Sequence, residues 1–159
     1  MNTLTMLTVM LALIGSALIG GVFFAFSSFI MKALARLPSS EGMAAMQSIN
    51  VLVLNPLFLG VFMGTTVISL LVSILAIMAW EMPSAPYYLA GAMLYIVGTF
   101  LVTGLGNVPL NNELAAVAVD DPAASDTWQL YFDEWTRLNT IRTVSAMLAA
   151  SMLLIGLVQ

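Results

Sequence analysis

Two long stretches without a charged residue limit what this chain of 159 residues can fold into. The first covers residues 1–31 and is followed by Lys32, and the second covers residues 42–80 and is followed by Glu81. A hydrocarbon layer about 30 Å thick is crossed by a helix of about 20 apolar residues. Both stretches are long enough, so the sequence predicts an integral membrane protein that lies in a lipid bilayer.

The composition supports this interpretation and removes several classes of function. Hydrophobic residues make up 61% of the chain and charged residues only 8%, whereas soluble domains carry about 25% charged residues. Four basic residues provide no patch for nucleic acid. The absence of cysteine excludes disulfides and thiolate metal sites, and the absence of histidine removes the usual ligands of haem and transition metals. We therefore expect no metal site.

The second uncharged stretch must contain a break, because 39 residues in one helix would measure about 60 Å. Asn55-Pro56 supplies it, since proline removes a backbone donor and clashes with the preceding turn. We expect a short amphipathic helix at the membrane surface before the break, over residues 40–54 with Ser39 as its N-cap.

Four spans follow from the same reasoning, and together with the surface helix they predict an all-α, four-helix transmembrane bundle. We expect the third span to close at Gly104 and Gly106. The first stretch is too long for a cleaved signal peptide and lacks the basic n-region of such a peptide, so we interpret it as a span. The spans lie in a single domain, residues 1–159, at about 4–30, 56–78, 87–105 and 138–158.

The most polar stretch, residues 106–137, separates the third and fourth spans and holds six of the eight acidic residues. Residues 120–122 (Asp-Asp-Pro) indicate a turn, and Ser125 or Asp126 is expected to cap the helix that continues into the fourth span.

Basic residues predict the orientation. Lys32 and Arg36 lie in the first connection, and Arg137 and Arg142 lie where the third connection meets the fourth span. The positive-inside rule places these connections in the cytoplasm and both termini outside, in a bacterial inner membrane.

Polar residues gather at the ends of three spans that share one side of the membrane. Asn55 precedes the second span, Asn107 and Asn111 follow the third, and Asn139 and Arg142 open the fourth. At 100° per residue, Asn139 and Arg142 share a face with Trp135. Other interpretations stay open: Asn55 as part of a kink, Asn107 as a cap, Trp135 as an interfacial anchor, and Arg142 reaching lipid headgroups.

Three segments of the chain are similar to the anthrone oxygenase family: GGVFFAFSSFIM at residues 20–31, GNVPLNNEL at 106–114 and WTRLNTIR at 135–142. The resemblance covers nearly the whole chain and implies a small membrane protein with four spans. Some fungal members are implicated in the oxidation of anthrones to anthraquinones. The resemblance therefore implies an oxygenase that acts in the membrane on anthrone-like or other lipophilic aromatic ketones, with dioxygen.

This chemistry requires no metal or flavin, because an anthrone enolate reacts directly with dioxygen, so we expect no cofactor. Arg142, Asn139 and Asn107 are the expected catalytic residues, as donors to the developing oxyanion. Glu113 and Asp133 are the carboxylates considered as the base. The residues expected to bind substrate are Trp135, Asn111, Asn55 and Tyr131. The alternative is a non-catalytic membrane protein that binds a lipophilic ligand or a partner subunit.

Overall fold

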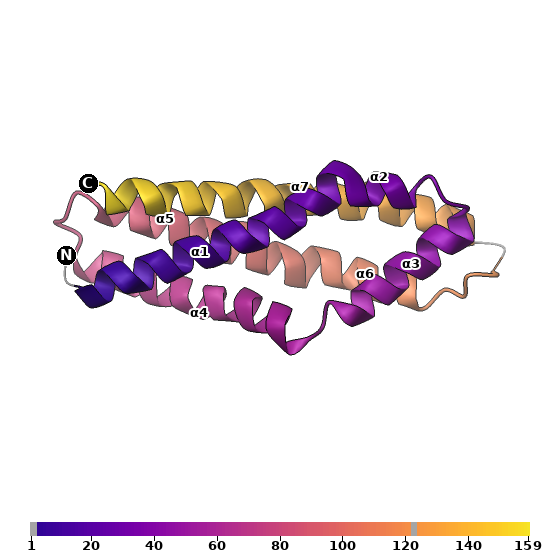
Figure 1. The fold of residues 1–159 in the computed structure, drawn as a ribbon, viewed down its shortest axis with the longest axis horizontal. Helices are drawn as coiled ribbons and strands as arrows, with labels where there is room; N and C mark the ends of the chain where they lie inside the picture. Colours follow the sequence, from indigo (N-terminus) through magenta and orange to yellow (C-terminus); the bar gives the residue numbers. More distant parts are fainter. Residues whose placement is uncertain (1–2, 122–123) are drawn as a thin grey trace.

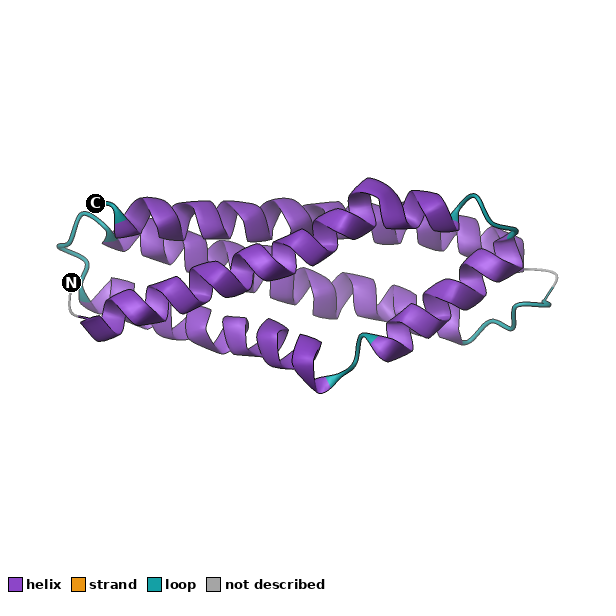
Figure 2. Ribbon diagram, viewed as in Figure 1, coloured by secondary structure: helices purple, strands orange, loops and turns teal. Residues whose placement is uncertain are grey.

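The chain forms an all-helical bundle in the computed structural model, which describes residues 3–121 and 124–159 (Figures 1 and 2). Four continuous helical segments are long and apolar enough to cross a membrane: Thr3–Leu34, Pro56–Met78, Ala85–Ala115 and Ala124–Leu157. The protein is therefore a multi-pass integral membrane protein, and the predicted four-helix transmembrane bundle is confirmed.

The four long segments divide into the following elements. The first consists of α1 (Thr3–Ala25), the π-helical turn η1 (Phe26–Ile30) and α2 (Met31–Leu34). After α3 (Ser39–Leu52), the second is α4 (Pro56–Met78). The third contains α5 (Ala85–Tyr95), η2 (Ile96–Leu101), η3 (Thr103–Asn107) and α6 (Val108–Ala115), and the fourth is α7 (Ala124–Leu157).

Each long segment packs against two neighbours. α1 lies against α4 and α7, and α5 closes the ring between the same two helices. α1 begins and α7 ends at one end of the bundle, where α4 is also connected to α5 (Figure 1). The α2–α3 and α6–α7 connections lie at the opposite end, where α3 packs against α2, α6 and α7.

Small residues permit close packing inside the ring. A Cβ atom on Gly15 of α1 would collide with Thr65 Oγ1 of α4, and one on Gly91 of α5 would lie 2.9 Å from the Ala149 carbonyl oxygen of α7. Such residues are what helices need in order to approach closely in a membrane. By contrast, apolar side chains such as Leu11, Ile74 and Leu154 are exposed on the outer face, where lipid would cover them.

Several expected helix ends differ from those observed. The first segment ends at Leu34 instead of residue 30, and α3 ends at Leu52 instead of residue 54. The third segment does not close at Gly104 and Gly106, because η3 carries the helix through both glycines into α6. A glycine within a helix costs only about 1 kcal/mol, and no described glycine has a positive φ. Pro109 lies in the first turn of α6, directly after this π-helical turn, where a proline is tolerated because the first amides of a helix need no partner within it.

Ser39 is the first residue of α3, not its cap. Pro38 holds the capping position, and its carbonyl oxygen accepts hydrogen bonds from the Glu41 and Gly42 backbone amides at 2.9 and 3.0 Å. The Ser39 hydroxyl instead lies 3.3 Å from that of Ser125.

α7 already includes Ala124, so neither Ser125 nor Asp126 precedes it as a cap. Of the predicted turn at 120–122, Asp120 and Asp121 lie in a turn and a bend, and Pro122 lies outside the described residues. At about 1.5 Å per residue, α7 is about 51 Å long, so about 20 Å of it extends beyond a hydrocarbon layer.

Candidate functional site

The first half of α7 turns one buried face toward the other helices. Its members are spaced three or four residues apart, as one face of a helix requires: Trp128, Tyr131, Trp135, Asn139 and Arg142. The first three of these side chains are aromatic and the last two are polar. The face predicted from helical geometry is therefore turned into the bundle, and its polar groups meet partners on α1, α3 and the third segment.

Arg142 is the charged residue of this face, and its side chain is only 4% exposed. One terminal nitrogen donates to Asn139 Oδ1 at 2.7 Å, and the other donates to Thr103 Oγ1 at 3.2 Å. The guanidinium carbon lies 4.0 Å from the centre of the Phe23 ring and 5.1 Å from a Trp135 ring. Within the described residues, Arg142 pairs with no carboxylate, and its Nε has no hydrogen-bond partner.

Asn139 fixes the position of the guanidinium. Its Oδ1 accepts the bond from Arg142, while its Nδ2 donates to the Phe23 carbonyl oxygen and to Ser27 Oγ, both at 2.7 Å. These acceptors lie at the junction of α1 and η1. Asn139 therefore connects α7 to the first segment and orients Arg142 at the same time.

Asn107 makes a different contact, with the backbone of α7. Its Nδ2 donates to the Trp135 carbonyl oxygen at 3.2 Å, whereas its buried Oδ1 has no partner. Thr99, on the same segment, donates through its hydroxyl to the Arg142 carbonyl oxygen at 3.3 Å. Both contacts hold the third segment against α7, at the turns on either side of the Arg142 guanidinium.

A second polar group lies where α3, α6 and α7 meet. Asn111 Oδ1 accepts hydrogen bonds from the Tyr131 hydroxyl at 2.9 Å and from Trp135 Nε1 at 2.8 Å. Asn50 of α3 donates to the same tyrosine hydroxyl at 3.3 Å. Asn111 thus satisfies two aromatic donors and holds their rings in place.

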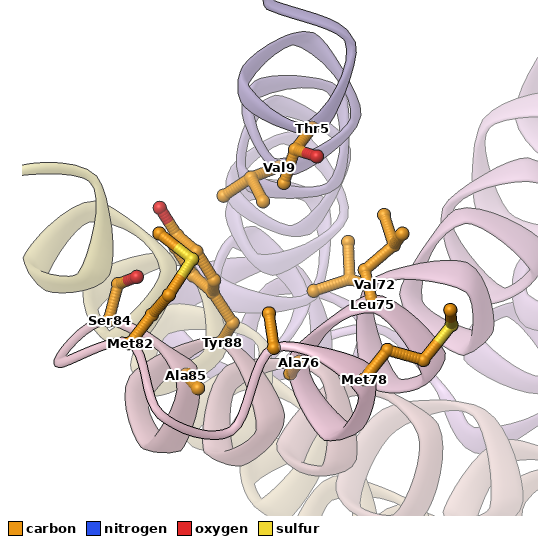
Figure 3. A pocket seen from close by; sticks show the side chains of 11 residues that line it. Thr5, Val9, Val72, Leu75, Ala76, Met78, Met82, Ser84, Ala85 and Tyr88 are labelled. Atoms are coloured by element: carbon orange, nitrogen blue, oxygen red, sulfur yellow. The ribbon is translucent and has the colours of Figure 1, made fainter. Parts of the chain in front are cut away.

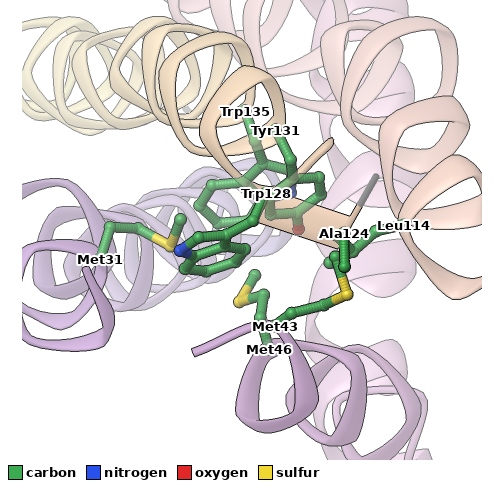
Figure 4. Close-up of a cluster of buried hydrophobic side chains, with 8 residues drawn as sticks. All are labelled: Met31, Met43, Met46, Leu114, Ala124, Trp128, Tyr131 and Trp135. Atoms are coloured by element: carbon green, nitrogen blue, oxygen red, sulfur yellow. The ribbon is translucent and has the colours of Figure 1, made fainter. Parts of the chain in front are cut away.

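Aromatic stacking continues from this group toward the polar end of the bundle. The rings of Trp128 and Tyr131 are stacked with their centres 5.9 Å apart, and those of Tyr131 and Trp135 with theirs 6.0 Å apart. Figure 4 shows the three rings in a row, with methionine side chains of α2 and α3 packed around them. Trp135 is thus packed into this buried cluster.

A cavity of about 180 Å³ lies beside Arg142. Its walls come from all the long segments and from α3. The aromatic members are Phe23, Phe26, Phe58, Phe62 and Trp135, and the other polar members are Asn50, Thr103, Asn111 and Arg142. Leu54 and Met63 also line it and are 66% and 46% exposed, so the cavity opens on the lipid-facing surface of the bundle.

The sequence model of the anthrone oxygenase family matches residues 57–152, about three fifths of the chain. The chain belongs to the anthrone oxygenase family. The matched region contains the third segment and the part of α7 that carries Trp135, Asn139 and Arg142. Searches of the curated proteins and of the solved structures gave no match.

The residues predicted for the site of this anthrone oxygenase family member occupy three kinds of position. Arg142, Trp135 and Asn111 line the cavity. Asn107, Asn139 and Tyr131 lie behind its wall, where they bond to the groups that line it. They are placed to position other groups, and direct contact with a ligand would require them to move.

Asn55 lies outside the cavity. It is exposed and caps α4, since its Oδ1 accepts from the Phe58 amide at 3.0 Å and its Nδ2 donates to the Leu52 carbonyl oxygen at 2.9 Å. Asn55 does line a neighbouring groove on the outer surface, which shares Val22 and Phe58 with the cavity.

Sequence reasoning missed two contacts of the guanidinium, Phe23 and Thr103. Phe23 lies in the segment at residues 20–31 that resembles the family, but an apolar residue in an apolar span carries no mark of its partner. Thr103 did have one: Thr99, Thr103, Asn107 and Asn111 recur at every fourth residue. That polar line was hidden by the assumption that the third span stops at Gly104.

Neither carboxylate considered as a base reaches the cavity. Glu113 and Asp133 are exposed, and Asp133 accepts a hydrogen bond from Gln129 at 3.2 Å. No acidic side chain lines the cavity itself. In the described part of the chain, no three Asp or Glu side chains gather in a group that could hold a metal ion.

A second cavity, of about 210 Å³, lies at the opposite end of the bundle. It is bounded by α1, the end of α4 and the start of α5 (Figure 3). The polar side chains that line it, Thr5, Ser84 and Tyr88, are all neutral.

Proposed function

We propose that this protein is a membrane-embedded oxygenase that oxidises an anthrone-like aromatic ketone in the cavity beside Arg142, without metal or flavin. The observation that supports it best is Arg142 itself: a buried cation that lines an aromatic cavity and has no acidic partner in the described chain. Membership of the anthrone oxygenase family supports the class of reaction.

The reaction needs few protein groups. Ionisation of the CH₂ group of the anthrone gives an enolate, which transfers one electron to dioxygen. The resulting carbon radical and superoxide combine to form a C–O bond, and the peroxide takes up a proton and then loses water to leave a carbonyl group. One dioxygen is consumed and one water is released for each CH₂ converted.

Arg142 supplies the electrostatic part of this reaction. The enolate carries its negative charge mainly on the ketone oxygen, and donors that are already in position stabilise such charge most effectively in a site without water. Asn139 and Thr103 hold the planar guanidinium in place. Its fork geometry suits an oxygen anion better than a lysine ammonium would.

The size and opening of the cavity suit a flat lipophilic molecule. A protein cavity of about 150 Å³ holds a benzene ring, so 180 Å³ accepts the reacting part of a polycyclic ketone. The remaining rings would extend between Leu54 and Met63 toward the lipid. The substrate would then reach Arg142 directly from the bilayer.

We further propose that the cavity end of the bundle faces the cytoplasm of a bacterial cell, with both termini outside. The support is that Lys32, Arg36 and Arg137 are exposed and belong to the same end of the bundle, as the positive-inside rule requires for cytoplasmic connections. Terminal reporters that are active only outside the cell would agree with this orientation.

The experiment for the oxygenase is dioxygen uptake by the protein in lipid nanodiscs supplied with anthrone, with formation of anthraquinone followed by absorbance. Spontaneous oxidation in empty nanodiscs is subtracted. We expect turnover by the native protein and its loss in Arg142→Gln. Arg137→Gln is the matched control, because Arg137 lies on the same helix but is exposed and paired with Glu134 at 2.7 Å. Turnover that persists unchanged in Arg142→Gln would contradict the proposal.

A second function has one observation in its favour. No acidic side chain lines the cavity, and a protein that only binds a lipophilic aromatic ligand requires no base. Saturable binding of anthrone to the native protein, lost in Arg142→Gln and without dioxygen uptake, would favour a binding protein over the oxygenase.

A further inference from the structure

The positive charge of Arg142 has no counter-charge in the described protein. Arg142 lies 15 residues before the end of α7, about 22 Å along the helix axis and therefore within a hydrocarbon layer about 30 Å thick. Buried ions are normally paired, because their desolvation is costly unless an opposite charge offsets it. The partners of this guanidinium are neutral: two hydrogen-bond acceptors, Asn139 and Thr103, and two aromatic rings.

The guanidinium also keeps unused capacity to donate. Its Nε has no partner, although the side chain is only 4% exposed. The Nε atom itself is buried, and other atoms of the side chain line the cavity, where a ligand can meet them. The other lining groups are aromatic rings, aliphatic side chains, amides and a threonine. Nothing in the cavity walls competes for a negatively charged ligand or repels one.

We propose that the cavity binds its aromatic ligand as a singly charged anion, so that the ligand supplies the counter-charge that Arg142 lacks. This inference rests on the proposed function and specifies its substrate: the aromatic ketone enters as a preformed enolate or phenolate. Its oxygen accepts hydrogen bonds from the guanidinium, and its ring packs among Phe23, Phe26 and Phe62. Its proton is lost to water before binding.

Two features of the site then have one explanation. A substrate that arrives already ionised needs no base in the cavity, and no carboxylate lines it. The same anion neutralises the buried arginine, so ligand binding and charge compensation occur together. The aromatic lining selects a ring-bearing anion over an inorganic ion or a fatty acid.

Benzoate and benzamide test this directly, because they have nearly the same shape and differ in charge at neutral pH. Their binding to the protein in lipid nanodiscs is measured by equilibrium dialysis, with empty nanodiscs subtracted. We expect the native protein to bind benzoate at least about tenfold more tightly than benzamide. We also expect benzoate to bind more tightly than hexanoate, an aliphatic carboxylate.

Two variants separate charge from shape. Arg142→Gln removes the cation, and Asn139→Asp places a carboxylate at the position whose oxygen now accepts from Arg142 at 2.7 Å. Both should abolish the preference for benzoate, and retained benzamide binding shows that the cavity is still formed. Arg137→Gln should keep the preference, since that arginine is exposed and already paired.

Three results would overturn the proposal: benzamide binding as tight as benzoate binding, a benzoate preference that survives in both site variants, or hexanoate binding equal to benzoate binding. The outcome is independent of the oxygenase assay. Selective benzoate binding without anthrone turnover would refute the oxygenase and keep the anion site. Anthrone turnover by a protein that does not prefer benzoate would support the oxygenase and refute the anion site.

Discussion

The two ends of the bundle contain cavities of similar size, about 180 Å³ beside Arg142 and about 210 Å³ beside Tyr88. Both are mainly apolar and are lined in part by α1 and α4, but α3 and α7 line only the cavity beside Arg142. They differ in charge, because one has a buried guanidinium with an unused donor, whereas the polar side chains of the other are neutral.

This difference favours the cavity at Arg142 over the cavity at Tyr88 as the proposed binding site. Imperfect packing between helices leaves space at either end, and space alone selects no ligand. An uncompensated charge is costly to maintain in a membrane, and intramembrane ionisable residues usually serve a function. The cavity at Arg142 therefore carries a cost that ligand binding would offset, and the cavity at Tyr88 carries none.

The comparison is tested most severely by filling each cavity in turn. Ile49 lines the cavity at Arg142 and Leu75 lines the one at Tyr88, and both are partly exposed aliphatic residues. We expect Ile49→Trp to lower anthrone turnover by about a hundredfold or more, because a displaced substrate loses its alignment with Arg142. Leu75→Trp should leave turnover within about twofold of native.

Turnover and benzoate binding are measured for both variants in nanodiscs, with circular dichroism to verify the helical content. If Leu75→Trp were the variant that lost activity, the site would lie at the wrong end of the bundle and the comparison would be reversed.

Much of this fold follows from the sequence, because lipid imposes simple requirements. Uncharged stretches of sufficient length gave the four spans, and Pro56 fixed the start of α4. Helical spacing was enough to place Trp135, Asn139 and Arg142 on one buried face.

The site was less predictable. Helical spacing shows which residues of α7 share a face, but it does not show which residues of the neighbouring helices they contact. The register between α1 and α7 decides that Asn139 bonds to the Phe23 carbonyl oxygen and Ser27. The register between the third segment and α7 decides that Asn107 bonds to backbone. The sequence shows that both asparagines lie near the same end of their spans, but it does not show their partners. For this reason both were predicted to donate hydrogen bonds to a ligand.

A smaller effect is expected from Asn111, which supports the charged cavity from its wall. Asn111→Leu would leave the Tyr131 hydroxyl and Trp135 Nε1 without their shared acceptor. We expect the free energy of unfolding to fall by about 1–3 kcal/mol, the cost of unpaired buried donors, and the KM for anthrone to rise because Trp135 lines the cavity.

Asn112→Leu is the matched control, since its side chain is exposed one residue further along α6. Chemical denaturation in detergent micelles measures the difference. Equal stability of the two variants would contradict the role of Asn111 in holding the two aromatic donors.

The smallest effect is expected at Asn55, a polar residue next to the charged cavity that does not line it. Asn55→Ala removes the cap of α4, with its bonds to the Phe58 amide and the Leu52 carbonyl oxygen. Loss of such a cap costs about 1 kcal/mol of stability, whereas Asn112→Ala on the exposed face of α6 should change the stability by less than about 0.5 kcal/mol.

Turnover and the preference for benzoate should stay within about twofold of native in Asn55→Ala, because Arg142 keeps all its partners. Denaturation curves and benzoate dialysis on the same preparations separate the two effects. A large loss of benzoate binding in Asn55→Ala would show that the groove beside Val22 and Phe58 belongs to the binding site. The site would then include residues outside the cavity at Arg142.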